Sequence, residues 1–504
     1  MLTVITVLPI ACLLILLMVL KLSAVKASIY TFCLTAAICF IYYKYTVFGA
    51  VISTLKGFSL SLFVILIIWG AIFLYNLASE AGALDVIGKN INIIINEQFL
   101  QFLLLSWIFA PFLQGIAGFG VPVVITVPFL LQMGIEPVKA AAAVLIGHSW
   151  AISFGSMGSS IYAINMVTQT DIGDITKFMV PFGTIGMFFT GLTVCYIYGG
   201  FSFIIKKALT IAVVTICMCA VMTAVVWHEM LSLIGILTAS GGIAAVMVIN
   251  KIKSAGKPKK ELYRAGINVA EAVMPYALIV ILSLFFFFLS PKLAFSFNFP
   301  GYQTMLGHVV DPAAKYVTIN ILKHPCSIIL MASAISVIVY VRKQALESGS
   351  SKKILRATVK KCWPITIALM ALLGTAVLMM DSGMIGHIAN ELVRLTGGAY
   401  PLVAPFIGLL GVFVTGSNTN SNVLFGSLQE TAALALGLNA ATVCASQSIG
   451  ASVGVALGPT MIALGATAAQ IQGQEYKIYR VVLLPTLLII LLLGAANLAI
   501  HAFI

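Results

Sequence analysis

A run of eight small or polar residues, 415–422, interrupts an apolar stretch late in the chain. Ser417, Asn418, Thr419 and Asn420 carry hydroxyl and amide donors. A helix that begins at this run also presents free backbone N–H groups at its positive end. Such a set of donors suits a carboxylate without any cation. The alternative is that these side chains only cap two helices and pack them together.

The same pattern occurs earlier in the chain, because residues 114–158 align without gaps on residues 417–461. Identical residues fall together at several places: Gly134 on Gly437, Ile146 on Ile449, Gly147 on Gly450, Ser149 on Ser452 and Gly155 on Gly458. The correspondence extends upstream, where residues 80–82 align with residues 381–383. Interrupted apolar segments at equivalent places in two halves are typical of a transporter substrate site. We therefore predict a site to which both halves contribute.

The first interruption, around residues 114–120, is rich in glycine rather than in polar side chains. Glycine permits positive φ angles and lets a ligand approach the backbone closely. The alternative is close helix packing through small residues. On the first interpretation, a wall opposite the polar run is formed by Gly118, Phe119, Gly120, His148 and Ser149, with Gln447 and Ser448 at its flank.

Two titratable side chains are candidates for carrying a proton. His148 is the histidine predicted to lie deep within a span, and imidazole titrates near neutral pH. The alternative for His148 is a neutral ring hydrogen-bonded to a neighbouring helix. Asp381, which the repeat pairs with Glu80, is the second candidate because it is predicted to be partly buried at a helix end. The sequence assigns no role to Glu80, Glu271 or Glu430.

The composition places these residues in a membrane protein. Hydrophobic residues make up 61% of the chain and charged ones 9%, with a mean hydropathy of +1.10, which is too apolar for a soluble fold. Apolar runs long enough to cross a hydrocarbon core predict spans near 3–20, 27–48, 58–79, 138–167, 179–204, 208–227, 230–250, 268–290, 326–341, 363–380, 438–470 and 481–503. The nine cysteines lack paired spacing. The sequence predicts no cofactor, no metal and no nucleic-acid partner.

The net charge of +13 follows topology rather than a binding patch. On the predicted topology, 21 of the 28 basic residues fall on one face, which is the pattern of cytoplasmic loops. Both termini are then outside, with about twelve crossings. An odd number of crossings is needed between Lys89 and Lys177. Residues 99–133 are therefore predicted as a re-entrant hairpin open to the inside, and residues 401–436 as one open to the outside.

The predicted fold is an all-α polytopic membrane protein with about twelve transmembrane helices in two inverted repeats. Each repeat contains a re-entrant hairpin, with tips near 114–120 and 416–422, and a broken helix, near 153–160 and 454–459. We divide the chain into four parts: N-terminal membrane helices (1–57), a first repeat (58–204), central helices with basic cytoplasmic loops (205–362) and a second repeat (363–504).

Several segments resemble the lactate permease family of bacterial carriers. They are GIAGFGVPVVI at 115–125, IGHS at 146–149, GSNTNSNVLFGSLQ at 416–429 and ASQSIGASVG at 445–454. The resemblance covers essentially the whole chain, although Asp381 stands where the family is expected to have an uncharged residue. It implies proton-coupled uptake of lactate, as either isomer, and of glycolate by a carrier embedded in the lipid of the plasma membrane.

Two other functions also agree with these residues. One is a sodium-coupled or exporting carrier of another small organic acid, because broken helices in membranes also bind Na⁺ through backbone carbonyls. The other is a membrane sensor that binds a metabolite without moving it, which the inverted repeat disfavours. The sequence does not fix the hydroxy acid, its stereoisomer, the coupling ion, the direction of transport or the oligomeric state.

Overall fold

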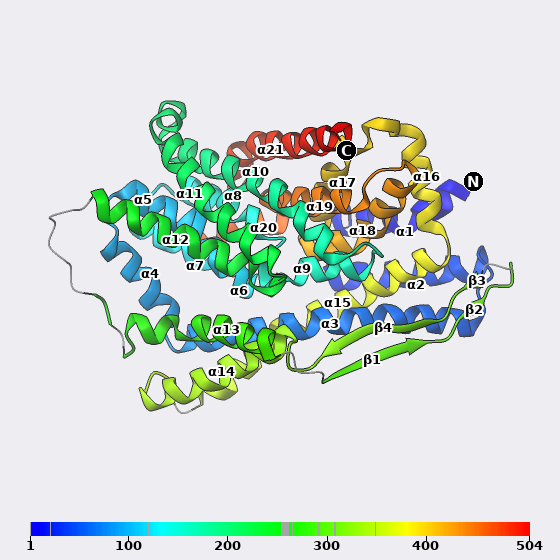
Figure 1. The fold of residues 1–504 in the computed structure, drawn as a ribbon, viewed down its shortest axis with the longest axis horizontal. Coiled ribbons are helices and arrows are strands. Elements are labelled where there is room, and N and C mark those ends of the chain that lie inside the picture. The colour runs from blue at the N-terminus through cyan, green and yellow to red at the C-terminus, as the bar shows by residue number, and fades with distance from the viewer. Residues whose placement is uncertain are drawn as a thin grey trace.

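The computed structural model describes residues 2–20, 22–118, 120–253, 262–264, 266–289, 293–306, 309–347 and 349–503. These residues form a large helical bundle with a small β structure along one edge (Figure 1). Two features singled out from the sequence lie outside the described residues: the predicted site residue Phe119 and residues 254–261 of a basic loop.

The helices follow one another with short connections. The first part of the chain forms α1 (Leu2–Met18), α2 (Ala24–Ile41), α3 (Val47–Glu80), α4 (Ala83–Ile94), α5 (Gln98–Leu103), η1 (Leu104–Phe109), α6 (Ala110–Ala117), α7 (Val121–Gln132), α8 (Pro137–Gly147), η2 (Ser149–Ala151), α9 (Gly155–Met166) and α10 (Ile172–Gly199). The central part forms α11 (Phe201–Trp227), η3 (Leu231–Leu233), α12 (Ile234–Lys253), α13 (Val269–Leu289) and α14 (Pro325–Arg342). The last part forms α15 (Ser350–Asp381), α16 (Met384–Thr396), η4 (Gly397–Ala399), α17 (Tyr400–Thr415), α18 (Asn418–Ala435), α19 (Ala440–Gly454), η5 (Val455–Leu457), α20 (Pro459–Ala468) and α21 (Glu475–Phe503).

Within the described residues, twelve helices are long and apolar enough to cross a membrane, which confirms the predicted helical, multi-pass fold class. The set differs in detail from the predicted spans. Segments Gln98–Ile116 and Met384–Thr415 also reach spanning length, whereas the predicted span 3–20 contains only the shorter apolar helix Ile5–Leu17. Helix length does not distinguish a re-entrant arm from a full crossing. The two hairpins and the four-part division therefore remain predictions.

The two longest helices, α3 and α15, have 34 and 32 residues. The predicted spans 58–79 and 363–380 cover only their apolar parts, because the first turns contain lysine and serine that a hydropathy window discounts. The two helices pack closely: a Cβ added to Gly57 would lie 2.6 Å from the Cα of Gly374. Small residues at such a contact let helix backbones approach one another.

Ion pairs at both ends of this helix pair show that α3 and α15 run antiparallel. At one end the Glu80 Oε2 atom, on the last residue of α3, lies 2.7 Å from Lys353 Nζ in the first turn of α15. At the other end Asp381 Oδ2, on the last residue of α15, lies 3.4 Å from Lys56 Nζ near the start of α3. The two acids paired by the sequence repeat therefore have equivalent structural positions.

The order of elements after α3 recurs after α15. Each long helix is followed by a short one (α4 and α16), a helical hairpin, a helix broken near its end (α8–α9 and α19–α20) and another long helix (α10 and α21). Gly82 and Gly383 end the long helices with φ angles of +69° and +81°. Gly134 and Gly437, at the next aligned turn, have φ angles of +78° and +67°. The sequence repeat is thus also a repeat of backbone conformation, and its inverted orientation stays a prediction.

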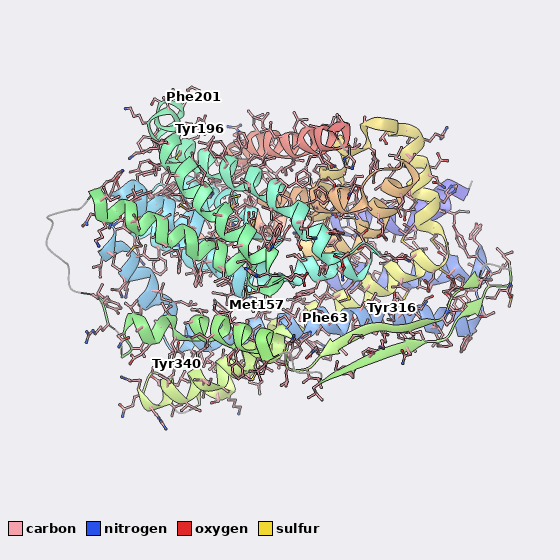
Figure 2. The ribbon with its side chains drawn as sticks, viewed as in Figure 1. Phe63, Met157, Tyr196, Phe201, Tyr316 and Tyr340 are labelled. Carbon is pink, nitrogen blue, oxygen red and sulfur yellow. The ribbon has the colours of Figure 1, made fainter. Side chains whose placement is uncertain are left out.

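A small β structure, not foreseen in the sequence, connects α13 to α14. Strand β1 (Ala294–Phe299) pairs antiparallel with β4 (Ala313–Asn320), and β2 (Tyr302–Gln303) pairs with β3 (Val309–Val310). The strands lie alongside the first half of α3 (Figure 1). Tyr316 of β4 faces that helix (Figure 2), with its ring centre 5.6 Å from Lys56 Nζ.

Candidate functional site

The site begins with four interruptions of helical structure. Helix α6 ends and α7 begins around residues 118–120, and α17 and α18 meet at residues 416–417. The helix predicted at 138–167 bends by 52° between α8 with η2 and α9. The fourth interruption, at Gly458, separates η5 from α20. Both predicted breaks, near 153–160 and 454–459, are confirmed.

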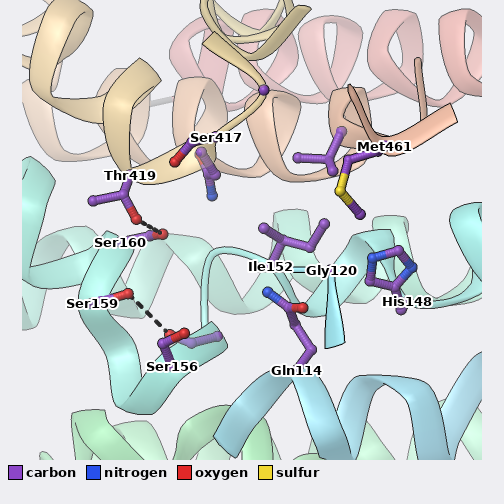
Figure 3. Close-up of a pocket in the computed structure, with 14 residues that line it drawn as sticks. Gln114, Gly120, His148, Ile152, Ser156, Ser159, Ser160, Ser417, Thr419 and Met461 are labelled. Atoms are coloured by element: carbon purple, nitrogen blue, oxygen red, sulfur yellow. Dashed lines mark hydrogen bonds between the residues drawn. The ribbon is translucent and has the colours of Figure 1, made fainter. Parts of the chain in front are cut away.

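These interruptions surround one small cavity of about 50 Å³, several times the ~10–15 Å³ that one water requires. Gln114 and His148 project into it opposite Ser417 and Thr419 (Figure 3). The complete lining is Gln114, Gly120, His148, Ile152, Gly155, Ser156, Ser159, Ser160, Gly416, Ser417, Asn418, Thr419, Val455 and Met461. Residues about 300 positions apart in the sequence therefore share one cavity.

The second tip meets the first half of the chain through side-chain hydrogen bonds. Asn418 donates from Nδ2 to the Oγ atom of Ser153 over 2.9 Å. The hydroxyl groups of Thr419 and Ser160 lie 2.9 Å apart. Ser417 caps α18, because its Oγ atom accepts from the backbone N–H of Asn420 at 3.4 Å. Capping, the alternative reading of this run, is thus real for Ser417, while the next two residues reach across the molecule.

A second set of contacts joins α19 to the same break. Ser153 donates from Oγ to the carbonyl of Ser448 over 2.9 Å. Its backbone N–H donates to Ser452 Oγ over 3.0 Å. Asn422 donates both to Ser448 Oγ and to the carbonyl of Ser160, each over 2.9 Å. Ser448, predicted at the flank of the site, therefore lies behind the cavity lining and bonds to Ser153 and Asn422.

The first tip uses shape rather than polarity. Gly120 has a φ angle of +80°, and a Cβ added there would lie 2.3 Å from Cδ2 of Leu464. Gly118 has a φ angle of +41°, and its Cβ would lie 2.2 Å from Oγ of Ser156. A residue with a side chain is strained in this region of φ, and here the space is filled as well. Close packing, the alternative reading of these glycines, is thus present together with exposure of Gly120 to the cavity.

The start of α9 has an unusual backbone. Ser156, Met157 and Gly158 have consecutive φ angles of +46°, +55° and +80°. Left-handed conformations at residues with a side chain cost of order 1–3 kcal/mol each, and they persist where the surroundings hold them, often at functional sites. Met157 is fully buried near the centre of the bundle (Figure 2), and Ser156 lines the cavity.

His148 is fully buried at the end of α8. Its Nδ1 atom bonds to the carbonyl oxygen of Val144, and because a carbonyl only accepts, Nδ1 carries a proton. Among the described residues, Nε2 has no hydrogen-bond partner. Since His148 lines the cavity, a proton acceptor lies next to the space that a ligand would occupy.

Gly118 and Ser448, described above, do not line the cavity, and neither do three other predicted site residues. Ser149 donates to the carbonyl of Ile146 over 2.8 Å. Gln447 is fully buried and donates to Ser421 Oγ over 3.3 Å. Asn420 lines a second cavity on the other side of the tip instead. Ser149 and Gln447 therefore lie behind the residues that line the central cavity, and Asn420 lies at the second cavity.

Asp381 is also separate from the cavity. Its Oδ2 atom accepts from Ser53 Oγ at 2.7 Å and from the hydroxyl of Tyr302 at 3.2 Å, beside the ion pair with Lys56. The structure therefore does not bring Asp381 together with His148. Its contacts join α15 to α3 and to the β structure.

The remaining acids of interest also have partners. Glu80 and Glu271 form ion pairs with Lys353 and Lys343, each over 2.7 Å. Glu430 accepts from the backbone N–H groups of Gln169 and Thr170 at 2.8 and 2.7 Å. These contacts account for the acids as structural elements. Among the described residues there is no group of three or more His, Cys, Asp or Glu side chains that could hold a metal ion.

The cavity is polar without an acidic or a lysine or arginine side chain in its lining. Helices α8 and α17 end at the cavity, with His148 and Gly416. Helices α7 and α18 begin at the same cavity, and so does the right-handed part of α9, which follows Gly158, so backbone N–H groups of three helix starts lie there. Hydroxyl and amide groups of Gln114, Ser160, Ser417 and Asn418 supplement them. Such a site suits the carboxylate of a small molecule. On the opposite side Ile152, Val455 and Met461 offer apolar contacts.

Five polar residues at or behind the cavity are not among the predicted site residues: Ser153, Ser156, Ser159, Ser160 and Asn422. The signal was available, because residues 153–160 contain four serines and two glycines next to His148. It was interpreted only as the position of a helix break. Contacts between the two breaks depend on tertiary structure, which a single sequence does not display.

The fold and the site together describe a multi-pass membrane transport protein, with a polar cavity between interrupted helices of two repeated halves. Comparison with known proteins identifies its family. Residues 3–504 match the family described as L-lactate permease, and the chain belongs to that family.

Individual relatives agree with this family over most of their lengths. The L-lactate permease of Streptococcus iniae is 30% identical, over 75% of this chain and 79% of the relative. The L-lactate permease of Escherichia coli strain K12 is 27% identical, over 92% of this chain and 89% of the relative. The glycolate permease of the same strain is 28% identical over the same shares of the two chains.

Proposed function

We propose that this protein is a proton-coupled symporter that carries lactate and related short 2-hydroxy-monocarboxylates, such as glycolate, across the plasma membrane. The observation that carries the proposal is the uncharged polar cavity at which three helix N-termini meet. Relatives named for L-lactate and for glycolate support this substrate class.

The carboxylate is proposed to bind at the second tip, against the first N–H groups of α18. Ser417, Asn418 and Thr419 provide side-chain donors there, and all three line the cavity. Hydrogen bonds to a charged group are worth about 1.5–3 kcal/mol each. Gln114 and Ser156 stand opposite the tip and can contact the 2-hydroxyl group. The small volume favours a small substrate, as a 2-hydroxy acid of two or three carbons is.

Proton coupling is proposed on energetic and geometric grounds. A monovalent anion entering a cell at 100 mV, negative inside, is opposed by about 2.3 kcal/mol. One proton moving with it removes that opposition, and each unit of inward pH gradient contributes about 1.4 kcal/mol. His148 is the proposed proton carrier, because its Nε2 atom lacks a protein partner in the described structure and the ring lines the cavity. For Asp381, the contacts with Lys56, Ser53 and Tyr302 favour a structural role.

The proposed orientation follows the charge distribution, with the lysine-rich connections in the cytoplasm and both termini outside. Both ends of the chain lie toward the upper right in Figure 1. Reaction of cysteines added at each terminus with a membrane-impermeant reagent on intact cells tests this orientation.

The experiment that tests the function uses purified protein in proteoliposomes. Uptake of labelled lactate and of glycolate is measured with a pH gradient or a Na⁺ gradient imposed separately. Uptake driven by the pH gradient, and abolished in a correctly inserted His148→Ala variant, is the expected result. Uptake driven only by Na⁺ would favour the sodium-coupled alternative. Survival of pH dependence in both His148→Ala and Asp381→Asn would show that the proton travels elsewhere.

A further inference from the structure

A second cavity, of about 300 Å³, adjoins the second tip. Its walls come from the start of α2, from α3 and from α15, none of which lines the central cavity. Gly416, Ser417 and Thr419 line both spaces. The tip segment Thr415–Asn420 therefore separates the two cavities, and its residues contact both of them.

The second cavity reaches the surface at the connection between α1 and α2. Ser23 and Ala24 line the cavity and are exposed, as is Pro364 on the facing helix. Exposed Lys26 lies in the first turn of α2, on a connection that the charge distribution assigns to the cytoplasm. The 18-residue helix α2 also begins at this opening, with its positive end toward the cavity mouth.

Four polar residues of the tip line this cavity, and two of them, Thr415 and Asn420, line it without lining the central cavity. Asn418 and Asn420 are two positions apart on α18, which turns their side chains by about 200° about the helix axis. Asn418 therefore contacts the central cavity and Asn420 the second one. Of the two asparagines, only Asn418 lines the space proposed for substrate binding.

Few contacts hold the tip against the first half of the protein. Side-chain bonds from Asn418 to Ser153 and between Thr419 and Ser160 cross the central cavity. Gly416 forms the turn itself with a φ angle of +69°. A carboxylate that takes the donors of Asn418 and Thr419 replaces the bonds that fix the tip. Binding then loosens the partition between the two cavities.

We infer that the second cavity is an access chamber on the cytoplasmic side, through which a small organic acid passes to and from the central cavity. Asn420 is a polar contact that belongs to this chamber and not to the central cavity, and segment Thr415–Asn420 is the movable partition. The identity of the acid rests on the proposed function. The existence of the chamber does not, and can be tested without any substrate.

The first test measures cysteine reactivity with a membrane-impermeant methanethiosulfonate, resolved by residue with mass spectrometry. Buried Cys444 is the unreactive native reference, and Lys26→Cys, on the exposed first turn of α2, is the reactive reference. Asn420→Cys is expected to react in inside-out vesicles and not in right-side-out vesicles. Asn418→Cys is expected to react more slowly in the same preparation. Absence of reaction at position 420, or reaction only from the outer face, would overturn the chamber.

The second test blocks the mouth of the chamber with bulk. Ala24→Trp adds a large side chain at an exposed lining residue, and Tyr30→Trp on the exposed face of the same helix is the matched control. Ala24→Trp is expected to slow lactate uptake about tenfold or more while the Kd for lactate in detergent stays within about twofold. Unchanged uptake would contradict the inference. Absence of lactate binding in the wild-type protein would instead refute the proposed function and leave the labelling test decisive.

Discussion

The two tips occupy equivalent places in the repeat and meet the same cavity, yet they are built differently. The first tip is described at Gly118 and Gly120, which have positive φ angles and no side chains of their own. The second tip, at Ser417–Asn420, has a capping serine followed by donors that reach across to Ser153 and Ser160. The first tip thus sets how closely a ligand can approach the backbone, and the second tip supplies the hydrogen-bond donors.

This difference shows how a duplicated element can divide its tasks. Both halves keep the helix break, because free N–H groups at a helix start require it. Only one half needs a full set of polar side chains, since each polar group inside a membrane is costly without a partner. Changes at the first tip should therefore alter the shape of the cavity and lower uptake. Changes at the second tip should each remove one donor and weaken the affinity for the substrate.

The largest effect is expected at the first tip. Gly120→Ala adds a Cβ that meets Cδ2 of Leu464, so either Leu464 or the tip beside the cavity must shift, and we expect uptake to fall roughly tenfold or more. Gly134→Ala is the matched control, since Gly134 has a nearly equal φ angle of +78° but no atom within 4 Å of an added Cβ. Uptake in proteoliposomes, normalised to inserted protein, provides the measurement. Equal losses in the two variants would mean that backbone strain alone matters.

The next effect is expected at the second tip. Asn418→Ala removes one donor to the bound carboxylate, and we expect the Kd for lactate to rise roughly tenfold or more. Asn497→Ala is the control, because this buried asparagine bonds to Pro401 and Ser446 away from the cavity. It should lower the thermal stability and leave the Kd unchanged. An unaltered Kd in Asn418→Ala would remove this residue from the binding site.

A smaller effect is expected where the halves meet. Ser160→Ala breaks the hydroxyl contact with Thr419, and a neutral hydrogen bond is worth about 0.5–1.5 kcal/mol. Lactate affinity should therefore change by a few-fold. A double-mutant cycle with Thr419→Val checks whether the two hydroxyls act together. Fully additive effects would show that the contact between α9 and the second tip does not contribute to binding.

The smallest effect on transport is expected far from both tips, at Glu97. Burial raises the pKa of this carboxyl, but hydrogen-bonded ion pairs with Lys207 and Lys253 outweigh it and hold the pKa below its ordinary value. The ionised form therefore stabilises the fold above the ordinary pKa, and this contribution is lost as the pH falls through the lowered value. Glu97→Gln should leave uptake at neutral pH unchanged. It should lower the melting temperature at pH 7 slightly, by an amount that shrinks toward pH 3.

The sequence predicted the class of fold and the places where helices break. Apolar runs identify membrane helices because the residues that face hydrocarbon must be apolar and their backbone groups must be bonded within the helix. Gly134 and Gly437 mark equivalent turns because a positive φ angle favours glycine. The β structure at 294–320 was not predicted, since its short strands carry no hydropathy signal in a membrane protein. The short helices α4 and α16 were missed because they are amphipathic and shorter than a span.

The candidate site was predicted in its centre and less well at its edges. Ser417, Asn418, Thr419, Gly120 and His148 line the cavity, because glycine and polar residues in an apolar stretch point directly to helix ends. Asn420 faces away because helical rotation of about 100° per residue separates neighbours that look alike in the sequence. Asp381 was proposed as a proton carrier because the repeat pairs it with Glu80 and because it was predicted to be partly buried at a helix end. Its actual partners on α3 and β2 are distant in sequence and were not visible.

The uncharged lining of the central cavity has a further consequence for the carrier's cycle. With a neutral His148 ring, the empty cavity holds no net charge, so the return of the unloaded carrier moves none across the membrane. The loaded carrier, with one anion and one proton, moves none either. On the proposed mechanism both halves of the cycle are electrically silent. Turnover then follows the acid and proton gradients alone, and the membrane potential neither accelerates nor retards it.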